Sequence, residues 1–138
     1  MSDLTYADVA VGDQIAPLPF ALDPSFIVAT AIASRDYQEV HHDPALAKER
    51  GSKDIFMNIL TTNGLIGRYV TDWAGPNAVI RKVAIRLGAP NYPGDTMTVT
   101  GTVTRKDAGE IEVAVVGANG LGNHVTGTVV LTLPGAEQ

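Results

Sequence analysis

The 138-residue chain contains no cysteine. This absence excludes a disulfide framework and catalysis by a thiol. No apolar run approaches the roughly 20 residues that a membrane-spanning helix needs, so we expect no membrane partner. The formal charge of −5 comes without a cluster of basic residues, which argues against a nucleic-acid surface. We therefore expect the partner to be a small molecule or another protein.

The sequence also lacks a linker, because no stretch rich in Pro, Gly or Ser divides it, and it contains no internal repeat. With 45% hydrophobic residues, a chain of this length can bury a core, and we predict a single domain over residues 1–138. Met1, Ser2 and Asp3 begin a polar segment without the basic and apolar regions of a signal peptide. A cytoplasmic location is the corresponding expectation.

The second half of the chain has the pattern of an antiparallel sheet. Segments rich in Val, Ile and Thr, separated by Gly, Asn, Asp and Pro, span 79–87, 96–105, 110–116 and 124–133. In 98–104 threonine alternates with Val or Gly. In 125–132 Val, Gly or Leu alternates with positions that hold Thr, except for Val130, so both segments have the pattern of a sheet with one buried face. Residues 107–109 and 118–120 supply turns between these strands.

The main helix is predicted just before these strands. Apolar residues recur there at helical spacing: Ile59, Ile66, Val70 and Trp73. This spacing predicts a helix with Asn58 as its N-cap and its end near Trp73. Gly64 and Gly67 inside it each cost about 1 kcal/mol relative to alanine, so we expect a wrapped sheet to pack against the backbone there.

The start of the chain is less regular. Pro17, Pro19 and Pro24 indicate loops, and the apolar segment 26–33 reads as a strand that runs into a short helix. One long helix followed by four antiparallel strands, with a strand or two before it, is an α+β arrangement in which the sheet curls round the helix. We therefore predict a hot-dog fold.

Residues 34–43, Ser-Arg-Asp-Tyr-Gln-Glu-Val-His-His-Asp, are the strongest candidate for an acid/base site. On one α-helix, Asp36 and His41 would point about 140° apart, so a shared substrate requires a loop between them. Asp43 and Pro44 predict the start of a short helix, with Asp as N-cap and Pro at the first helical position. Asp36 and His41 thus flank a turn in which their side chains can converge.

Each of these residues also has a structural interpretation. Asp36 suits a turn that accepts backbone N–H groups, and His41 suits a hydrogen-bonded loop position. His42 is expected to be structural or solvent-facing. Adjacent histidines followed by Asp43 rarely converge on one ion, and no further ligand set is visible, so we expect no metal.

The chain resembles the MaoC-like (R)-specific enoyl-CoA hydratases, in which an aspartate and a histidine are spaced as in Asp-x-Asn-Pro-x-His. Asp36 and His41 occupy these two catalytic places. Residues 89–96 are similar to the family's Pro-Gly-Asp-Thr strand entry, and 119–130 to its last hairpin. The chain departs from the pattern where Arg35, Gln38 and Glu39 replace the usual Gly, Asn and Pro.

A narrower resemblance is to the small catalytic subunit of the actinobacterial steroid (cholesterol) side-chain enoyl-CoA hydratase. It rests on residues 41–43 and 51–61, including Met57 and Asn58 where the wider family commonly has His-Gly. This resemblance implies a heterotetramer with a larger MaoC-like partner subunit, and a steroid with a shortened side chain on CoA as the acyl-CoA substrate. It implies no cofactor, because CoA is part of the substrate.

Hydration of an α,β-unsaturated thioester requires activation of water, a proton for the α-carbon and stabilisation of an enolate. At neutral pH, Asp36 and His41 can hold one water between a carboxylate and an imidazole nitrogen, and we expect both to be required. Which of them takes the proton stays open, because coupled groups titrate as a pair. Backbone N–H groups near Asn58 and Ile59, at the helix start, would bind the thioester oxygen.

Candidate contacts for the CoA phosphates are predicted from charge and from position in the sequence. CoA phosphates require local positive charge, and we select Lys53, Arg81 and Lys82 from the available cations. Asn63 and Thr62 face either the acyl pocket or a neighbouring subunit. Two alternative functions remain: a hot-dog acyl-CoA thioesterase, and a non-catalytic subunit that completes a partner's acyl-CoA site.

Overall fold

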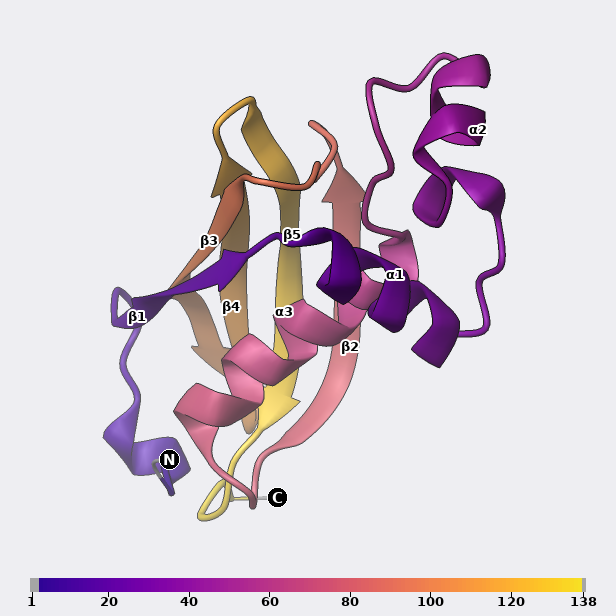
Figure 1. Cartoon of the computed structure of the whole chain (residues 1–138). Helices are drawn as coiled ribbons and strands as arrows, with labels where there is room; N and C mark the ends of the chain where they lie inside the picture. Colours follow the sequence, from indigo (N-terminus) through magenta and orange to yellow (C-terminus); the bar gives the residue numbers. More distant parts are fainter. Residues whose placement is uncertain (1–2, 138) are drawn as a thin grey trace.

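A five-stranded antiparallel sheet curls round one long helix in the computed structural model, which describes residues 3–137 (Figure 1). The strands are β1 (Gln14–Ala21), β2 (Val79–Leu87), β3 (Thr96–Asp107), β4 (Glu110–Asn119) and β5 (Gly122–Thr132). The helices are α1 (Pro24–Ala33), α2 (Pro44–Glu49), α3 (Ile59–Ala74) and the 3-10 turns η1 (Tyr6–Asp8) and η2 (Glu39–His41). This architecture confirms the predicted α+β hot-dog fold.

The strand order β1-β3-β4-β5-β2 leaves β1 and β2 at the two edges of the sheet. One face of the sheet packs on α3, which explains the alternating pattern in the sequence. On β3, Met97, Val99 and Val103 are buried, while the intervening threonines are not. From α3, Ile66 and Val70 are fully buried in the same core.

The hairpin turns differ in how they are built. Ala108 and Gly109 join β3 to β4 with φ of 50° and 77°, the left-handed values that a two-residue hairpin loop requires. Gly120 and Leu121 join β4 to β5. The Asp95 carboxylate accepts the backbone N–H of Gly120 at 2.9 Å, which ties the Pro-Gly-Asp-Thr segment to this hairpin.

The expectation of a loop around Pro17 and Pro19 is wrong, because both residues lie in β1. This strand pairs with β3 on one side and is otherwise an edge, where a missing N–H donor is tolerated. Its register shifts between Ile15 and Leu18, so Pro17 also sits in an irregular stretch of the ladder.

The interpretation of 26–33 as a strand leading into a helix is also wrong, since α1 covers the whole segment. Pro24, assigned to a loop, is the first helical residue. Asp23 is the N-cap, and its carboxylate accepts the N–H of Phe26 at 2.7 Å. An apolar run alone does not distinguish a strand from a buried helix, and here the capping residues decide.

The predicted caps of the other two helices are confirmed. Asp43 accepts the N–H groups of Ala45 and Leu46 at 2.9 and 3.2 Å, at the start of α2. Asn58 accepts the N–H of Thr61 at 3.2 Å, at the start of α3. Both helices thus begin at the residues the sequence indicated.

The expectation that the sheet packs against both helix glycines is wrong for Gly64. A Cβ at Gly64 would have no neighbouring atom within 4 Å, and one at Gly67 would meet only the Ile80 side chain at 3.8 Å. Gly64 therefore lies on an open face of α3, away from the sheet.

Residues 1–2 and 138, which the predictions of a single domain and of a polar start include, lie outside the described residues. Between residues 3 and 137, no helix is both long enough and apolar enough to cross a bilayer. The cytoplasmic location stays a prediction.

We expect alanine at Gly127 and at Gly64 to have opposite effects on stability. A Cβ on Gly127 would overlap the carbonyl oxygen of Ala84 and approach Cα of Ile85 to 3.0 Å, and neither backbone atom can rotate away. Gly127→Ala should lower the free energy of unfolding by about 1–3 kcal/mol. Gly64→Ala, in open space within a helix, should raise it by about 0.5–1 kcal/mol. Urea unfolding of the two variants and the wild type measures both values, and equal effects would contradict this packing.

Candidate active site

Asp36 and His41 lie on either side of the turn that follows α1. Their side chains meet, with Asp36 Oδ2 3.3 Å from His41 Nε2. Arg35 reverses the chain at the end of α1 with φ of 55°, a region that favours glycine, and the N–H of Asp36 then donates to the carbonyl of Ala31 at 2.9 Å. The structure brings the two predicted side chains together, while their catalytic role stays a prediction.

A backbone contact fixes the orientation of the His41 ring. Nδ1 lies 2.7 Å from the carbonyl oxygen of Phe56, so Nδ1 carries the hydrogen and donates it. The rings of His41 and Phe56 meet edge to face, with centroids 4.9 Å apart. In a neutral ring, Nε2 is then the nitrogen with a free lone pair, and it faces Asp36.

The Asp36 carboxylate is held on both oxygens. Oδ1 accepts the N–H of Gln38 at 3.2 Å, and Oδ2 accepts Asn58 Nδ2–H at 3.1 Å. Burial raises the pKa of Asp36, but the hydrogen bonds from Asn58 and Gln38, with the nearby imidazoles of His41 and His42, outweigh it and lower the pKa below its ordinary value. Asp36 is therefore ionised at neutral pH.

His42 has the structural role expected from the sequence. Its Nε2 lies 2.7 Å from the carbonyl oxygen of Asp36 and donates to it, and this hydrogen bond stabilises the turn between the two residues. His41 Nδ1 and His42 Nε2 thus each form a hydrogen bond to a backbone carbonyl oxygen. Within residues 3–137, no three His, Asp or Glu side chains are grouped closely enough to share a metal ion. The expected absence of a metal stays a prediction.

A cavity of about 300 Å³ opens beside the Asp36–His41 pair. It is lined by residues of the turn, the start of α3 and the end of β2: Asp36, His41, Phe56, Met57, Asn58, Ile59, Leu87, Gly88, Pro90 and His124. The backbone N–H of Thr61 donates to the side-chain oxygen of Asn58. The N–H groups of the first residues of a helix have no carbonyl acceptor within the helix, because no helical turn precedes them. Asn58 and Ile59 thus bring the positive end of α3 to this cavity, while their binding of the thioester oxygen stays a prediction.

His124 forms part of the cavity wall, and the sequence analysis missed it. Its Nδ1–H donates to the carbonyl of Ala89 at 2.7 Å, and Nε2 accepts the hydroxyl of Thr62 at 2.8 Å. Burial lowers the pKa of His124, more than the bond to Ala89 raises it, so the ring is neutral. Alternation along β5 would put His124 on the outer face with the threonines. It is buried because Gly88 and Ala89 fold over the strand, with Gly88 N–H bonded to the His124 carbonyl at 2.7 Å.

The other predicted binding residues are dispersed. Lys53 lies in the loop before α3, with its ammonium 5.9 Å from the centre of the Tyr92 ring. Lys82 is exposed on β2, and Arg81, near the start of that strand, borders a separate hollow formed with residues 132–137. Asn63 is half-buried and does not line the cavity. The structure does not bring the three cations together, and their contact with CoA stays a prediction.

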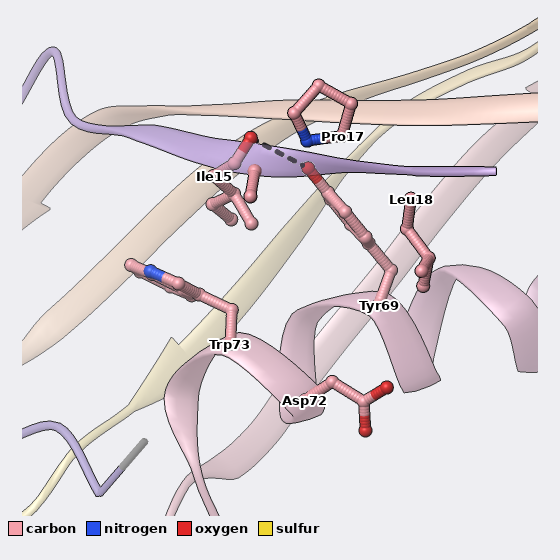
Figure 2. Close-up of a pocket in the computed structure, with 7 residues that line it drawn as sticks. Ile15, Pro17, Leu18, Tyr69, Asp72 and Trp73 are labelled. Atoms are coloured by element: carbon pink, nitrogen blue, oxygen red, sulfur yellow. Dashed lines mark hydrogen bonds between the residues drawn. The ribbon is translucent and has the colours of Figure 1, made fainter. Parts of the chain in front are cut away.

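A second hollow of about 300 Å³ lies between β1 and the later half of α3 (Figure 2). Its lining is Ile15, Ala16, Pro17, Leu18, Tyr69, Asp72 and Trp73. The Tyr69 hydroxyl donates to the carbonyl of Ile15 at 3.2 Å, and burial raises the pKa of Tyr69 to about 12. The Asp72 carboxylate points away from β1 in Figure 2 and pairs with Arg68 at 3.4 Å. This hollow lacks convergent acid/base groups, so the cavity beside Asp36 is the candidate active site.

Comparisons with known proteins identify the family of this chain. The family model described as "MaoC like domain" matches residues 9–124. The 3-oxo-4,17-pregnadiene-20-carboxyl-CoA hydratase beta subunit of Mycobacterium tuberculosis is 55% identical over 123 residues, which cover 89% of this chain and 95% of that protein.

Solved structures are similar over nearly the whole chain. The ChsH1-ChsH2 complex from Mycobacterium tuberculosis matches with a TM-score of 0.89 and 55% identity, covering 90% of this chain and 98% of the matched one. The R-hydratase PhaJ1 from Pseudomonas aeruginosa, at 23% identity, shares the fold with a TM-score of 0.87 over 96% of this chain and 86% of its own. Because the family model spans most of the sequence and the first relative exceeds half identity, the chain belongs to the MaoC-like domain family.

Proposed function

We propose that this chain is the catalytic subunit of a 2-enoyl-CoA hydratase that adds water to a steroid side-chain enoyl-CoA. The observation that carries the proposal is the approach of Asp36 Oδ2 to His41 Nε2 at 3.3 Å on the wall of a cavity. The 55% identical relative is named a hydratase of a pregnadiene carboxyl-CoA, which supports both the reaction and the substrate class.

The geometry suggests how the pair activates water. Asp36 Oδ2 and His41 Nε2 are both acceptors when the carboxylate is ionised and the imidazole is neutral. A water between them donates one hydrogen to each, which directs an oxygen lone pair towards the β-carbon of the substrate. Attack forms the C–O bond, and one water proton passes to the pair. The pair returns a proton to the α-carbon, so the net change is addition of one water.

The thioester oxygen gains negative charge as the double bond is attacked. We propose that backbone N–H groups at Asn58 and Ile59 stabilise it. The location of these two residues at the positive end of α3, on the lining of the same cavity, supports this role. No charged side chain is needed for this step. The proposed reaction needs no cofactor, since CoA is part of the substrate.

A partner subunit is part of the proposal. Within residues 3–137, no strand pairs with the outer edge of β2, whose last residue lines the cavity. Ile59, which also lines the cavity, and Leu60 are 49% and 51% exposed, and Gly64 opens the same helix to close approach. An uncovered strand edge with exposed apolar side chains favours association. The similar solved structure is a complex of two proteins, which supports a heteromer, and we propose the predicted heterotetramer with a larger subunit.

We predict that Asp36→Asn and His41→Gln each reduce kcat at least about 100-fold in the assembled protein, because each removes one acceptor of the water. Loss of the enoyl-thioester absorbance measures the rate. Glu39→Gln is the matched control, since this exposed carboxylate of η2 pairs with Arg50, is not among the residues that line the cavity, and should keep wild-type turnover. Near-normal turnover in either test variant refutes the catalytic pair, and release of free CoA in place of the hydrated product would favour the thioesterase.

Leu60→Asp should prevent assembly with a co-expressed MaoC-like partner subunit, because it places a charge on the exposed apolar start of α3. The isolated variant should remain folded, since Leu60 is half-exposed there. Val11→Asp is the control, as Val11 is 61% exposed but lies before β1. Co-purification and size-exclusion chromatography provide the measurement. Assembly of Leu60→Asp at wild-type yield would place the interface elsewhere.

A further inference from the structure

We propose that the side-chain amide of Asn58 is a positioning residue that keeps Asp36 ionised and fixes it relative to the start of α3. The inference rests on the proposed hydratase function, to which it adds the group that holds the catalytic carboxylate in its charged form and in position. It concerns the side chain of Asn58, whereas the thioester oxygen would contact its backbone.

The orientation of the amide follows from its partners. Asn58 Oδ1 lies 3.2 Å from the backbone N of Thr61 and also accepts the Thr61 hydroxyl. A backbone N–H can only donate, so this end of the amide must be the oxygen. The nitrogen end therefore faces Ser34 Oγ at 2.8 Å and Asp36 Oδ2 at 3.1 Å.

The amide has no remaining hydrogen-bonding capacity, which makes it a fixed donor. Its two N–H groups serve Ser34 and Asp36, and its oxygen has two donors from Thr61. Ser34 directs its own hydrogen at the carbonyls of Thr30 and Ala31, at 2.9 and 3.0 Å, so it accepts from Asn58. Asn58 is 2% exposed, and water cannot readily replace it.

A donor aimed at Asp36 Oδ2 stabilises the carboxylate over the neutral acid. Oδ2 is also the oxygen nearest His41 Nε2, so Asn58 acts on the atom that would hold the water. The other groups that face Asp36 are His41 and His42 from the turn and η2, and His124 from β5 lines the same cavity. Asn58 is the donor from α3, and it joins the acid/base pair to the helix end that would hold the thioester oxygen.

The test uses two variants that retain an N-cap but lose the amide donor. Ser caps a helix about as well as Asn, so Asn58→Ser should stay folded while the Asp36 carboxyl, followed by ¹³C NMR, titrates at higher pH than in the wild type and kcat falls. Asn58→Asp puts a second carboxylate against Asp36 and should raise the Asp36 pKa further, because like charges disfavour ionisation. KM should change little, since the side chain touches Asp36 rather than the substrate.

Two controls separate this role from capping alone. Thr61→Val removes a hydroxyl from the oxygen end of the same amide but leaves the Asp36 contact, and it should keep the wild-type Asp36 titration. Asp23→Ala removes the cap of α1 and should lower the melting temperature without changing the Asp36 titration. An Asp36 titration unchanged in both folded Asn58 variants overturns the inference, and so does an equal shift in the controls.

Titration of the Asp36 carboxyl by ¹³C NMR in wild type and Asn58→Ser gives a readout independent of turnover. A higher carboxyl pKa in the variant supports the inference, and identical values contradict it. If the wild type fails to hydrate enoyl-CoA, the proposed function fails, while the NMR titration still decides the role of Asn58.

Discussion

The hydrogen bond between His41 Nδ1 and the carbonyl of Phe56 is the constraint on which the site depends. It fixes the ring so that Nε2, and not Nδ1, meets Asp36. Phe56 belongs to the loop that leads into α3, and its own N–H donates to the carbonyl of Val40 at 3.2 Å. The turn that carries the acid/base pair and the segment that begins the helix are therefore joined as one unit, and movement of either would separate the pair from the helix end.

The cavity beside Asp36 is formed by the sheet and by the start of α3. The sheet supplies the back wall through β5 and the loop after β2, while α3 supplies its N-terminus. The remaining side is an unpaired strand edge and the exposed apolar start of the helix, within the part of the chain that the structure describes. In the proposed assembly, part of the acyl environment would come from the chain that covers this edge.

Much of the fold was predictable because its signals are local. Threonine alternation placed β3 and β5, and Asp43-Pro44 and Asn58 placed two helix starts. Asp23-Pro24 is the same kind of helix start and marks α1, but the apolar run beyond it also fits a strand and so predicted the wrong element. Prolines in β1 were misleading because whether a strand lies at an edge is a property of the whole sheet.

The site was only partly predictable, because only some of its contacts are between residues close together in the sequence. The convergence of Asp36 and His41 follows from a short turn, and their residue types match a family pattern. The bond from Asn58 to Asp36 joins residues 22 positions apart, and the bond from His124 to Thr62 joins residues 62 apart. No periodicity predicts such contacts. They follow from how the loops after α1 and β2 fold over the sheet and α3.

The most direct test of the account is the fate of solvent oxygen. The assembled protein is incubated with enoyl-CoA in ¹⁸O-water, and the products are analysed by mass spectrometry. Addition of water at the β-carbon predicts a 3-hydroxyacyl-CoA that carries one ¹⁸O in its hydroxyl group and an intact thioester. Label recovered in the carboxylate of a free acid, together with released CoA, would contradict the account, because water would then have attacked the carbonyl carbon.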